Sequence, residues 1–226
     1  MFERYAIFYT PEAGPFADLM AAWLGWNSAT GQPTAQPVIA GLDVARLTAR
    51  PRKYGFHATL KAPFNLAANV TPLSLKDAVD IIAQRHAAVS LGTLDISARH
   101  GFLALRPKTA PTGLRDLAAA IVTELDRFRA PLTTDDIVRR RKSRLTARQN
   151  QQMLEWGYPH IFDDFHFHMT LTGPLRHARQ ETVIAQLQER IAPVLPSKLR
   201  LEALTLMGQD TQGMFHQIHR TALRAR

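Results

Sequence analysis

Apolar and polar positions alternate along some parts of the chain and recur at helical spacing along others. The aromatic and β-branched stretch 4–10, RYAIFYT, predicts a strand. The Gly, Pro and Ser content of residues 28–37 predicts a loop. Between them a helix is expected, with five apolar residues on one face: Phe16, Leu19, Met20, Trp23 and Leu24.

Later segments predict three more amphipathic helices and two hairpins. Residues 91–107 predict a hairpin that turns at Arg99–Gly101, and residues 199–224 predict another that turns near Asp210–Gly213. The basic run and residues 145–157 are expected to be helical as well. The helical stripes are Leu75, Val79, Ile82 and Val89; then Leu114, Leu117, Ile121, Leu125 and Phe128; and finally Val183, Ile184, Leu187 and Ile191.

One short pattern occurs twice, as GFHATLKAPF at 55–64 and as FHMTLTGPL at 167–175. Both copies have the order Phe-His-x-Thr-Leu-x-x-Pro-apolar, and the histidines lie 168 − 57 = 111 residues apart. The following hairpin repeats too, because its turn glycine comes 101 − 57 = 44 residues after the first histidine and 213 − 168 = 45 after the second. A repeat at half the chain length predicts two similar lobes.

The predicted fold class is therefore α+β, with both lobes in a single domain spanning 1–226. The motif units cover approximately 53–107 and 165–222.

Side chains two residues apart on a strand point to the same face. His57 and Thr59 should therefore share one face, His168 and Thr170 another, and a pseudo-twofold axis would bring the two faces across one cleft. Two facing histidines suit phosphodiester cleavage, in which a base activates the entering oxygen and an acid protonates the leaving one. The threonine hydroxyls would then donate to the phosphoryl oxygens, where charge accumulates.

The same alternation adds candidate substrate contacts. Lys61 is expected beside His57, while Thr172 and His166 are expected beside His168. Tyr54, just before the first motif, is a further candidate. For Lys61 a lysine at a strand end, with its ammonium in solvent, is the competing interpretation.

Composition narrows the function classes. The net charge of +9 favours anionic partners, such as a phosphorylated small molecule or an RNA end, although solubility alone also explains it.

The chain has no cysteine, which excludes thiolate metal sites and fits a reducing, cytoplasmic location. The longest apolar run, LMAAWLGW, is too short for a membrane span, and the first residues lack a secretion signal. No cofactor and no obligatory protein partner are expected. The basic run at 139–144 is most typical of a solvated helix face.

The duplicated His-x-Thr motif resembles the two-histidine (2H) phosphoesterase superfamily, which includes 2′,3′-cyclic phosphodiesterases. The stretches RKYGFHATLKAPF, RLTARQ, WGYP and FHFHMTLTGPL are similar to a bacterial branch named for phosphonate metabolism. The resemblance covers essentially the whole chain. It implies a bilobal fold with two antiparallel sheets around a central cleft and helices outside, and it implies catalytic roles for His57, Thr59, His168 and Thr170 in a metal-independent hydrolase.

Three other interpretations remain open. His166 and His168 form a His-x-His pair that could bind a metal. The charge and the aromatic residues could belong to a non-catalytic RNA-binding module. The repeated histidines could also be hydrogen-bonded core residues.

Overall fold

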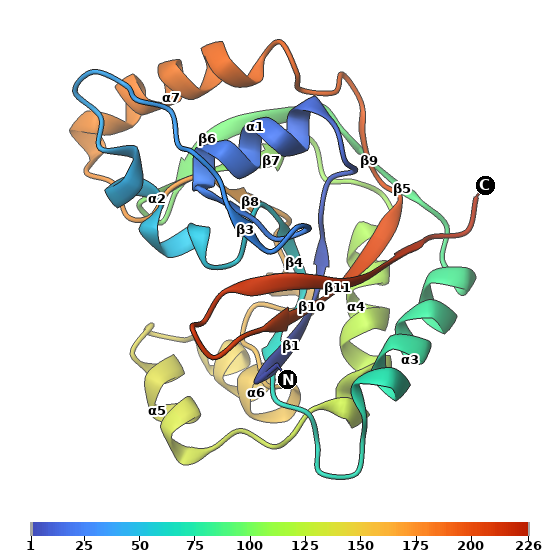
Figure 1. The fold of residues 1–226 in the computed structure, drawn as a ribbon. Helices are drawn as coiled ribbons and strands as arrows, with labels where there is room; N and C mark the ends of the chain where they lie inside the picture. Colours follow the sequence, from blue (N-terminus) through green and yellow to red (C-terminus); the bar gives the residue numbers. More distant parts are fainter. Residues whose placement is uncertain (1, 226) are drawn as a thin grey trace.

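The computed structural model describes residues 2–225, which form an α+β fold with antiparallel sheets (Figure 1). A four-stranded sheet has the order β11–β10–β1–β4, and a three-stranded sheet has the order β6–β7–β8. The predicted fold class is confirmed. The strands of the first sheet are β1 (Arg4–Tyr9), β4 (Ala58–Phe64), β10 (Ala203–Gln209) and β11 (Phe215–Ala222), and those of the second are β6 (Leu94–Arg99), β7 (Phe102–Pro107) and β8 (Met169–Thr170). Two short antiparallel pairs join β2 (Trp26–Asn27) to β3 (Gln32–Pro33) and β5 (Val89–Gly92) to β9 (Leu199–Leu201).

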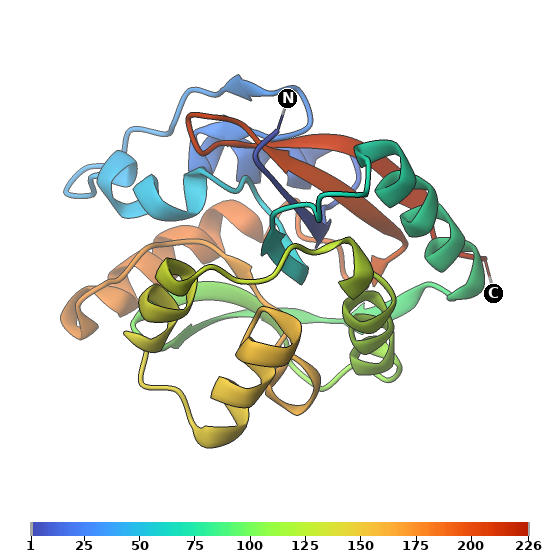
Figure 2. The same ribbon diagram turned by 90° about the horizontal axis from the view of Figure 1, so that it is seen from below.

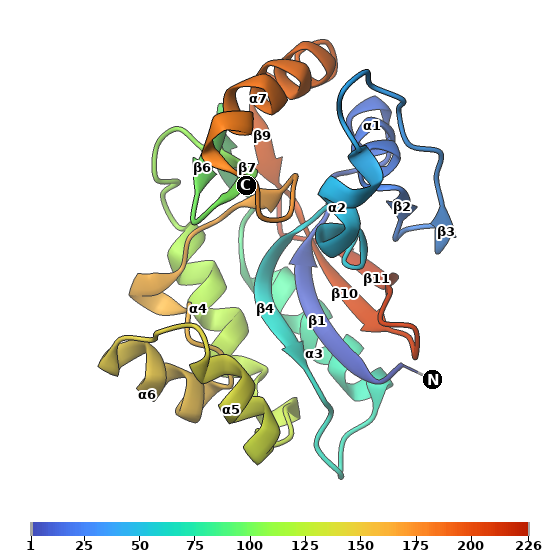
Figure 3. The same ribbon diagram turned by 90° about the vertical axis from the view of Figure 1, so that its left-hand side faces the viewer.

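The helices surround the sheets. α3 packs against β10 and β11, α4 against β4, and α7 against β6. Figures 2 and 3 show α4, α5 and α6 grouped on the β4 side of the molecule. None of the helices within residues 2–225 has the length and apolarity to cross a bilayer. The helices are α1 (Pro15–Leu24), α2 (Val44–Arg52), α3 (Pro72–Arg85), α4 (Leu114–Glu124), α5 (Thr134–Arg141), α6 (Ala147–Trp156) and α7 (His177–Ile191), with 3-10 turns η1 (Asp126–Phe128) and η2 (Phe162–Asp164).

Each hairpin completes the sheet that holds the other half's motif. The β6–β7 hairpin follows the first motif in sequence, but β7 pairs with β8 of the second motif. The β10–β11 hairpin follows the second motif, but β10 pairs with β1, which pairs with β4 of the first motif. The two repeat units therefore cross, and each motif strand pairs with a strand from outside its own unit. The division into two pseudosymmetric lobes stays a prediction.

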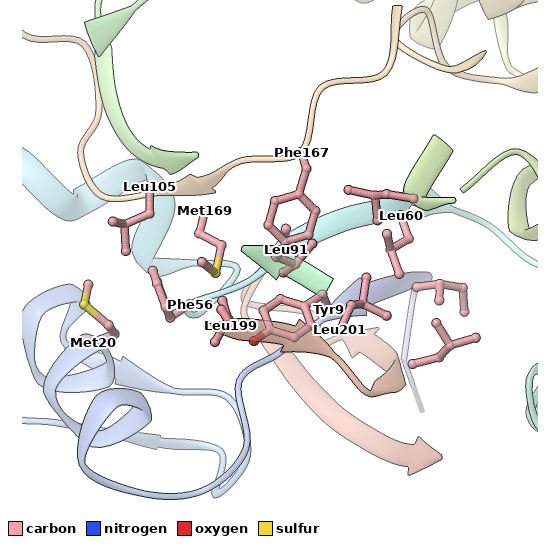
Figure 4. Packing of buried hydrophobic residues seen from close by; sticks show 14 of the residues in the cluster. Tyr9, Met20, Phe56, Leu60, Leu91, Leu105, Phe167, Met169, Leu199 and Leu201 are labelled. Atoms are coloured by element: carbon pink, nitrogen blue, oxygen red, sulfur yellow. The ribbon is translucent and has the colours of Figure 1, made fainter. Parts of the chain in front are cut away.

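The apolar residues of both motifs enter one shared core (Figure 4). Phe56 and Leu60 come from the first motif, and Phe167 and Met169 from the second. The ring of Phe167 lies 5.7 Å from that of Tyr9 on β1, which links the second motif to the first sheet. Burial of these side chains is the hydrophobic contribution that holds the two motifs in fixed relation.

An extra residue interrupts β4 directly after the first motif's threonine. Phe8 lies opposite Thr59, but its neighbour Ile7 lies opposite Lys61, so one β4 residue between them has no partner on β1. Phe8 and Ile7 are adjacent on β1 and point to opposite faces of the sheet. Paired residues share a face, so Thr59 and Lys61 also point to opposite faces. The prediction that Lys61 shares the face of the motif histidine is wrong for this reason.

A corresponding irregularity follows the threonine of the second motif. The Leu103 carbonyl accepts from both the Leu171 amide, at 2.9 Å, and the Thr172 amide, at 3.3 Å. Thr172 Oγ1 accepts from the Leu103 amide at 3.0 Å and is fully buried. The expected regular alternation therefore ends before Thr172, and its hydroxyl closes the strand pairing instead of joining the histidine's face.

Several predicted boundaries also differ. α2 was not predicted; its N-terminus is capped by the Asp43 side chain, and Pro51 lies in its last turn. Val89 belongs to β5, and Phe128 lies in η1 beyond the end of α4. The loop expected at 28–37 contains the short strand β3. The first strand and both hairpin turns lie where the sequence placed them.

Thr172→Val should destabilise the fold, because it leaves the buried Leu103 amide without its acceptor while keeping the side-chain shape. We expect a loss of about 1–3 kcal/mol in the free energy of unfolding, measured with urea. Thr182→Val, at an exposed position on α7, is the control and should change stability by no more than about 0.5 kcal/mol. Equal stability of the Thr172 variant and the original protein would show that the hydroxyl does not support the pairing.

Candidate active site

His57 lies immediately before β4 and is held from two sides. Its Nδ1–H donates to the carbonyl of Gly55 at 2.9 Å. Its ring stacks on Phe8 of the neighbouring strand, with ring centroids 3.9 Å apart. Gly55 has a φ of +69°, and a Cβ there would meet Ser28 Oγ at 2.6 Å, so the turn that presents this carbonyl favours glycine.

His168 repeats the same arrangement in the other sheet. Its Nδ1–H donates to the carbonyl of His166, again two residues earlier, at 2.7 Å. Its ring packs against Phe102 of the neighbouring strand β7, with centroids 5.7 Å apart. Both histidines are half-buried, so neither is a fully enclosed core residue.

These hydrogen bonds fix the tautomer of both imidazoles. A carbonyl oxygen can only accept, so Nδ1 carries the proton in each ring and the neutral ring keeps its lone pair on Nε2. The Thr59 hydroxyl donates to His57 Nε2 at 3.3 Å, so the hydroxyl and the acceptor nitrogen face the same space. Thr170 is half-buried and lies opposite Ala104 on β7. Each motif thus presents one Nε2 and one threonine.

The two imidazoles interact electrostatically although they come from different sheets. Burial, with a smaller part from the positive charge of His168, lowers the pKa of His57 to about 4; the bond to Gly55 opposes this. Burial likewise lowers the pKa of His168, with a contribution from Arg106 on β7. Both rings are therefore neutral at pH 7, and a bound anion would raise both pKa values.

Further aromatic side chains lie around the two histidines. Tyr54, which follows α2, stacks on His57 at 5.6 Å. In the segment after α6, burial raises the pKa of Tyr158, with a contribution from the Tyr54 phenol. The Tyr158 ring lies 5.6 Å from that of His160, and the charge of His160 contributes to the lowered pKa of His168. Sequence patterns did not identify Tyr158 and His160; only the stretch WGYP marked this segment.

The remaining candidates lie apart from this arrangement or join it indirectly. Lys61 Nζ donates to the Val122 carbonyl at 3.0 Å and to Asp126 at 3.4 Å, and burial lowers its pKa to about 8. The imidazole of His166 is exposed, and its backbone carbonyl is what orients His168. Within residues 2–225, no three His, Asp or Glu side chains gather as a metal site, so the His166/His168 pair has no third ligand there.

Comparison with known families identifies the family of this chain. Residues 59–216 match the family described as "Protein of unknown function (DUF1045)". The chain belongs to the DUF1045 family.

A curated relative from Janthinobacterium sp. (strain Marseille), named "Ribose 1,5-bisphosphate phosphokinase PhnN", is 35% identical over 218 residues, which are 93% of this chain and 48% of that protein. A protein of the same name from Laribacter hongkongensis (strain HLHK9) is 35% identical over 174 residues, 76% of this chain and 40% of that protein. This DUF1045 chain thus spans about half the length of the curated relatives it matches.

Solved structures give weaker likenesses. E. coli LigT complexed with NADP⁺ has a TM-score of 0.47 at 14% identity and is covered over 98% of both chains. A protein described as a phosphoesterase has a TM-score of 0.43 at 18% identity, covering 99% of both chains.

The coupling between the two imidazoles can be measured by NMR titration. We expect His57 to titrate near pH 4 in the original protein. We expect its pKa to rise in His168→Gln, because the repulsion from the second ring is removed. His177→Gln, at an exposed position on α7, is the control and should leave the His57 titration unchanged. If His57 titrates identically with and without His168, the rings do not face each other.

Proposed function

We propose that this protein is a metal-independent phosphodiesterase that opens a cyclic phosphate by two-histidine acid–base catalysis. The observation that carries the proposal is the repeated geometry of His57 and His168, each with Nδ1 bonded to the carbonyl two residues earlier and Nε2 left as the acceptor. In-line displacement at phosphorus needs a base on one side and an acid on the other, and this pair supplies both.

The order of the pKa values assigns the two roles. His57 has the strongly lowered pKa and stays neutral over the wider pH range, which suits the base. The pKa of His168 is lowered less strongly, so this ring holds a proton more readily beside an anionic substrate, which suits the acid. Nε2 of His57 takes a proton from water, the water oxygen bonds to phosphorus, and the bond to the leaving ribose oxygen breaks. His168 gives its proton to that oxygen.

The threonines act on the charge that develops during this step. Thr59 Oγ1 lies beside the Nε2 of the proposed base, where it can donate to a non-bridging phosphoryl oxygen. Thr170 occupies the corresponding position in the second motif. The product is a phosphomonoester with a free hydroxyl group.

A ribose cyclic phosphate is the substrate class that we favour over an RNA end. Both curated relatives are named for a kinase that acts on ribose 1,5-bisphosphate, and this chain matches about half of each. Opening the 1,2-cyclic phosphate of a ribose 5-phosphate yields ribose 1,5-bisphosphate. A role in phosphonate metabolism, which the sequence resemblance implies, would fit such a product.

The proposal predicts hydrolysis of ribose cyclic phosphates in the presence of a chelator. His57→Gln and His168→Gln should each lower kcat by roughly 10²–10⁴-fold, because each removes one proton transfer. His177→Gln should retain full activity. The assay compares ribose 1,2-cyclic phosphate, 2′,3′-cyclic nucleotides and short RNAs with cyclic ends. Near-original rates in either motif variant, or activity only on the RNAs, would count against this proposal.

The pH dependence should show a maximum on the acid side of neutrality. As pH falls through about 4, His57 gains a proton and can no longer act as the base. As pH rises through the lowered pKa of His168, the acid is lost. We therefore expect a bell-shaped profile of kcat/KM with its maximum between these two values and below the ordinary histidine value of ~6.5. A plateau extending above neutral pH would be inconsistent with these roles.

A further inference from the structure

β4 is an edge strand of its sheet, and α4, α5 and α6 lie on its side of the molecule (Figure 3). Residues of β4 and of these three helices line a small basic hollow. Its volume is about 110 Å³. Aromatic side chains, including Trp156 and Tyr158, form part of its wall. Four cationic side chains and one carboxylate line it: Arg4, Lys61, Arg129, Arg140 and Asp136. The excess of positive charge favours an anionic occupant.

Two of these cations already have a carboxylate partner. Lys61 and Arg129 share Asp126, with Nζ at 3.4 Å and the guanidinium at 2.8 and 3.1 Å. Within residues 2–225, the Arg4 side chain has no carboxylate partner and donates to the neutral amide of Gln209, at 2.6 Å. The charge that remains for a ligand is therefore mainly that of Arg4 and Arg140.

Arg140 has an unused donor. Its Nε is buried and has no hydrogen-bond partner among residues 2–225. The nearby carboxylate of Asp136 is bonded to Thr133 and to Arg139. A buried donor without an acceptor costs stability, and a bound acceptor at this position would remove that cost. Arg140 is also the member of the basic run that turns inward, since Arg139 is exposed.

The hollow and the two-histidine site lie along the same strand. His57 immediately precedes β4, and residues 61–64 at the other end of that strand line the hollow. The Arg140 guanidinium lies over the Tyr158 ring there, 5.7 Å from its centroid. Arg4 and Phe8 are four residues apart on the same face of β1, and the His57 ring stacks on Phe8. At ~3.3 Å per residue, the two positions are about 13 Å apart along the strand. A ligand that reaches both places must carry a second group at some distance from the diester.

The charge of the hollow indicates what that second group is. The positive charge left on Arg4 and Arg140 favours an anionic group such as a phosphoryl over a neutral nucleoside. The planar guanidinium of an arginine bonds two phosphate oxygens at once, which suits the free Nε.

We propose that Arg140, with Arg4 and Tyr158, binds a terminal phosphoryl group of the substrate while His57 and His168 act on its cyclic diester. This inference rests on the proposed function and narrows it to sugars that carry both a cyclic phosphate and a phosphomonoester. The site would discriminate against cyclic phosphates that lack the second anionic group.

The test compares ribose 1,2-cyclic phosphate with and without a 5-phosphate. The original protein should have the higher kcat/KM on the 5-phosphorylated substrate. Arg140→Gln should lower kcat/KM on that substrate roughly 10- to 100-fold and leave the other substrate unchanged. Arg144→Gln is the matched control, since it removes the same charge from an exposed position in the same run. Equal effects of Arg140→Gln on both substrates, or on neither, would overturn the subsite.

Folding is checked separately. Arg140→Lys keeps the positive charge but loses the planar guanidinium that bonds two oxygens. It should recover part of the preference for the 5-phosphorylated substrate that Arg140→Gln loses. Thermal unfolding of both Arg140 variants should match that of Arg144→Gln. If Arg140→Gln unfolds early, the comparison is made with Arg140→Lys, and unchanged selectivity in that folded variant refutes the subsite.

Failure of the proposed function gives a different result. In that case the original protein hydrolyses neither substrate, and calorimetric binding of ribose 5-phosphate tests the subsite alone. Binding that is at least roughly tenfold weaker in Arg140→Gln than in Arg144→Gln supports it. Equal dissociation constants, or no binding to the original protein, overturn it.

Discussion

The hydrogen bond from histidine Nδ1 to the carbonyl two residues earlier is the constraint on which the rest of the site depends. It occurs at His57 with Gly55 and at His168 with His166. In each case the ring packs on an aromatic side chain of the neighbouring strand, and Nε2 is left as the acceptor nitrogen. Without the hydrogen bond the imidazole could rotate or change tautomer, and the pair would lose its defined proton positions. The same bond also opposes the effect of burial on both pKa values.

The exchange of hairpins explains why the two motifs hold their positions relative to each other. Phe8 lies on β1, between β4 and the hairpin that follows the second motif, while Phe102 lies on the hairpin that follows the first. Each half of the chain therefore helps to build the sheet beside the other half's histidine. The apolar sides of both motifs meet in one core, so the two imidazoles cannot move apart without disturbing shared packing.

The sequence predicted the fold class, and it placed Thr59 beside His57 because period-two alternation holds over those three residues. It did not predict where alternation stops. The interruptions after Thr59 and Thr170 depend on registers with β1 and β7, which are distant in sequence, and they turn Lys61 and Thr172 away from the histidines. Arg140 illustrates the same limit. A basic run is usually solvated, and only the packing of α5 beside Tyr158 distinguishes its inward residue from its neighbours.

The central claim is that both imidazoles act on one phosphorus atom. A crystal structure with a ribose–vanadate complex, which imitates the five-coordinate phosphorus of in-line displacement, tests it most directly. The account predicts vanadium between the two rings, with one apical oxygen at about 2.6–3.2 Å from Nε2 of His57 and the other at a similar distance from Nε2 of His168. Vanadate bound to one histidine alone, or bound elsewhere, would contradict it.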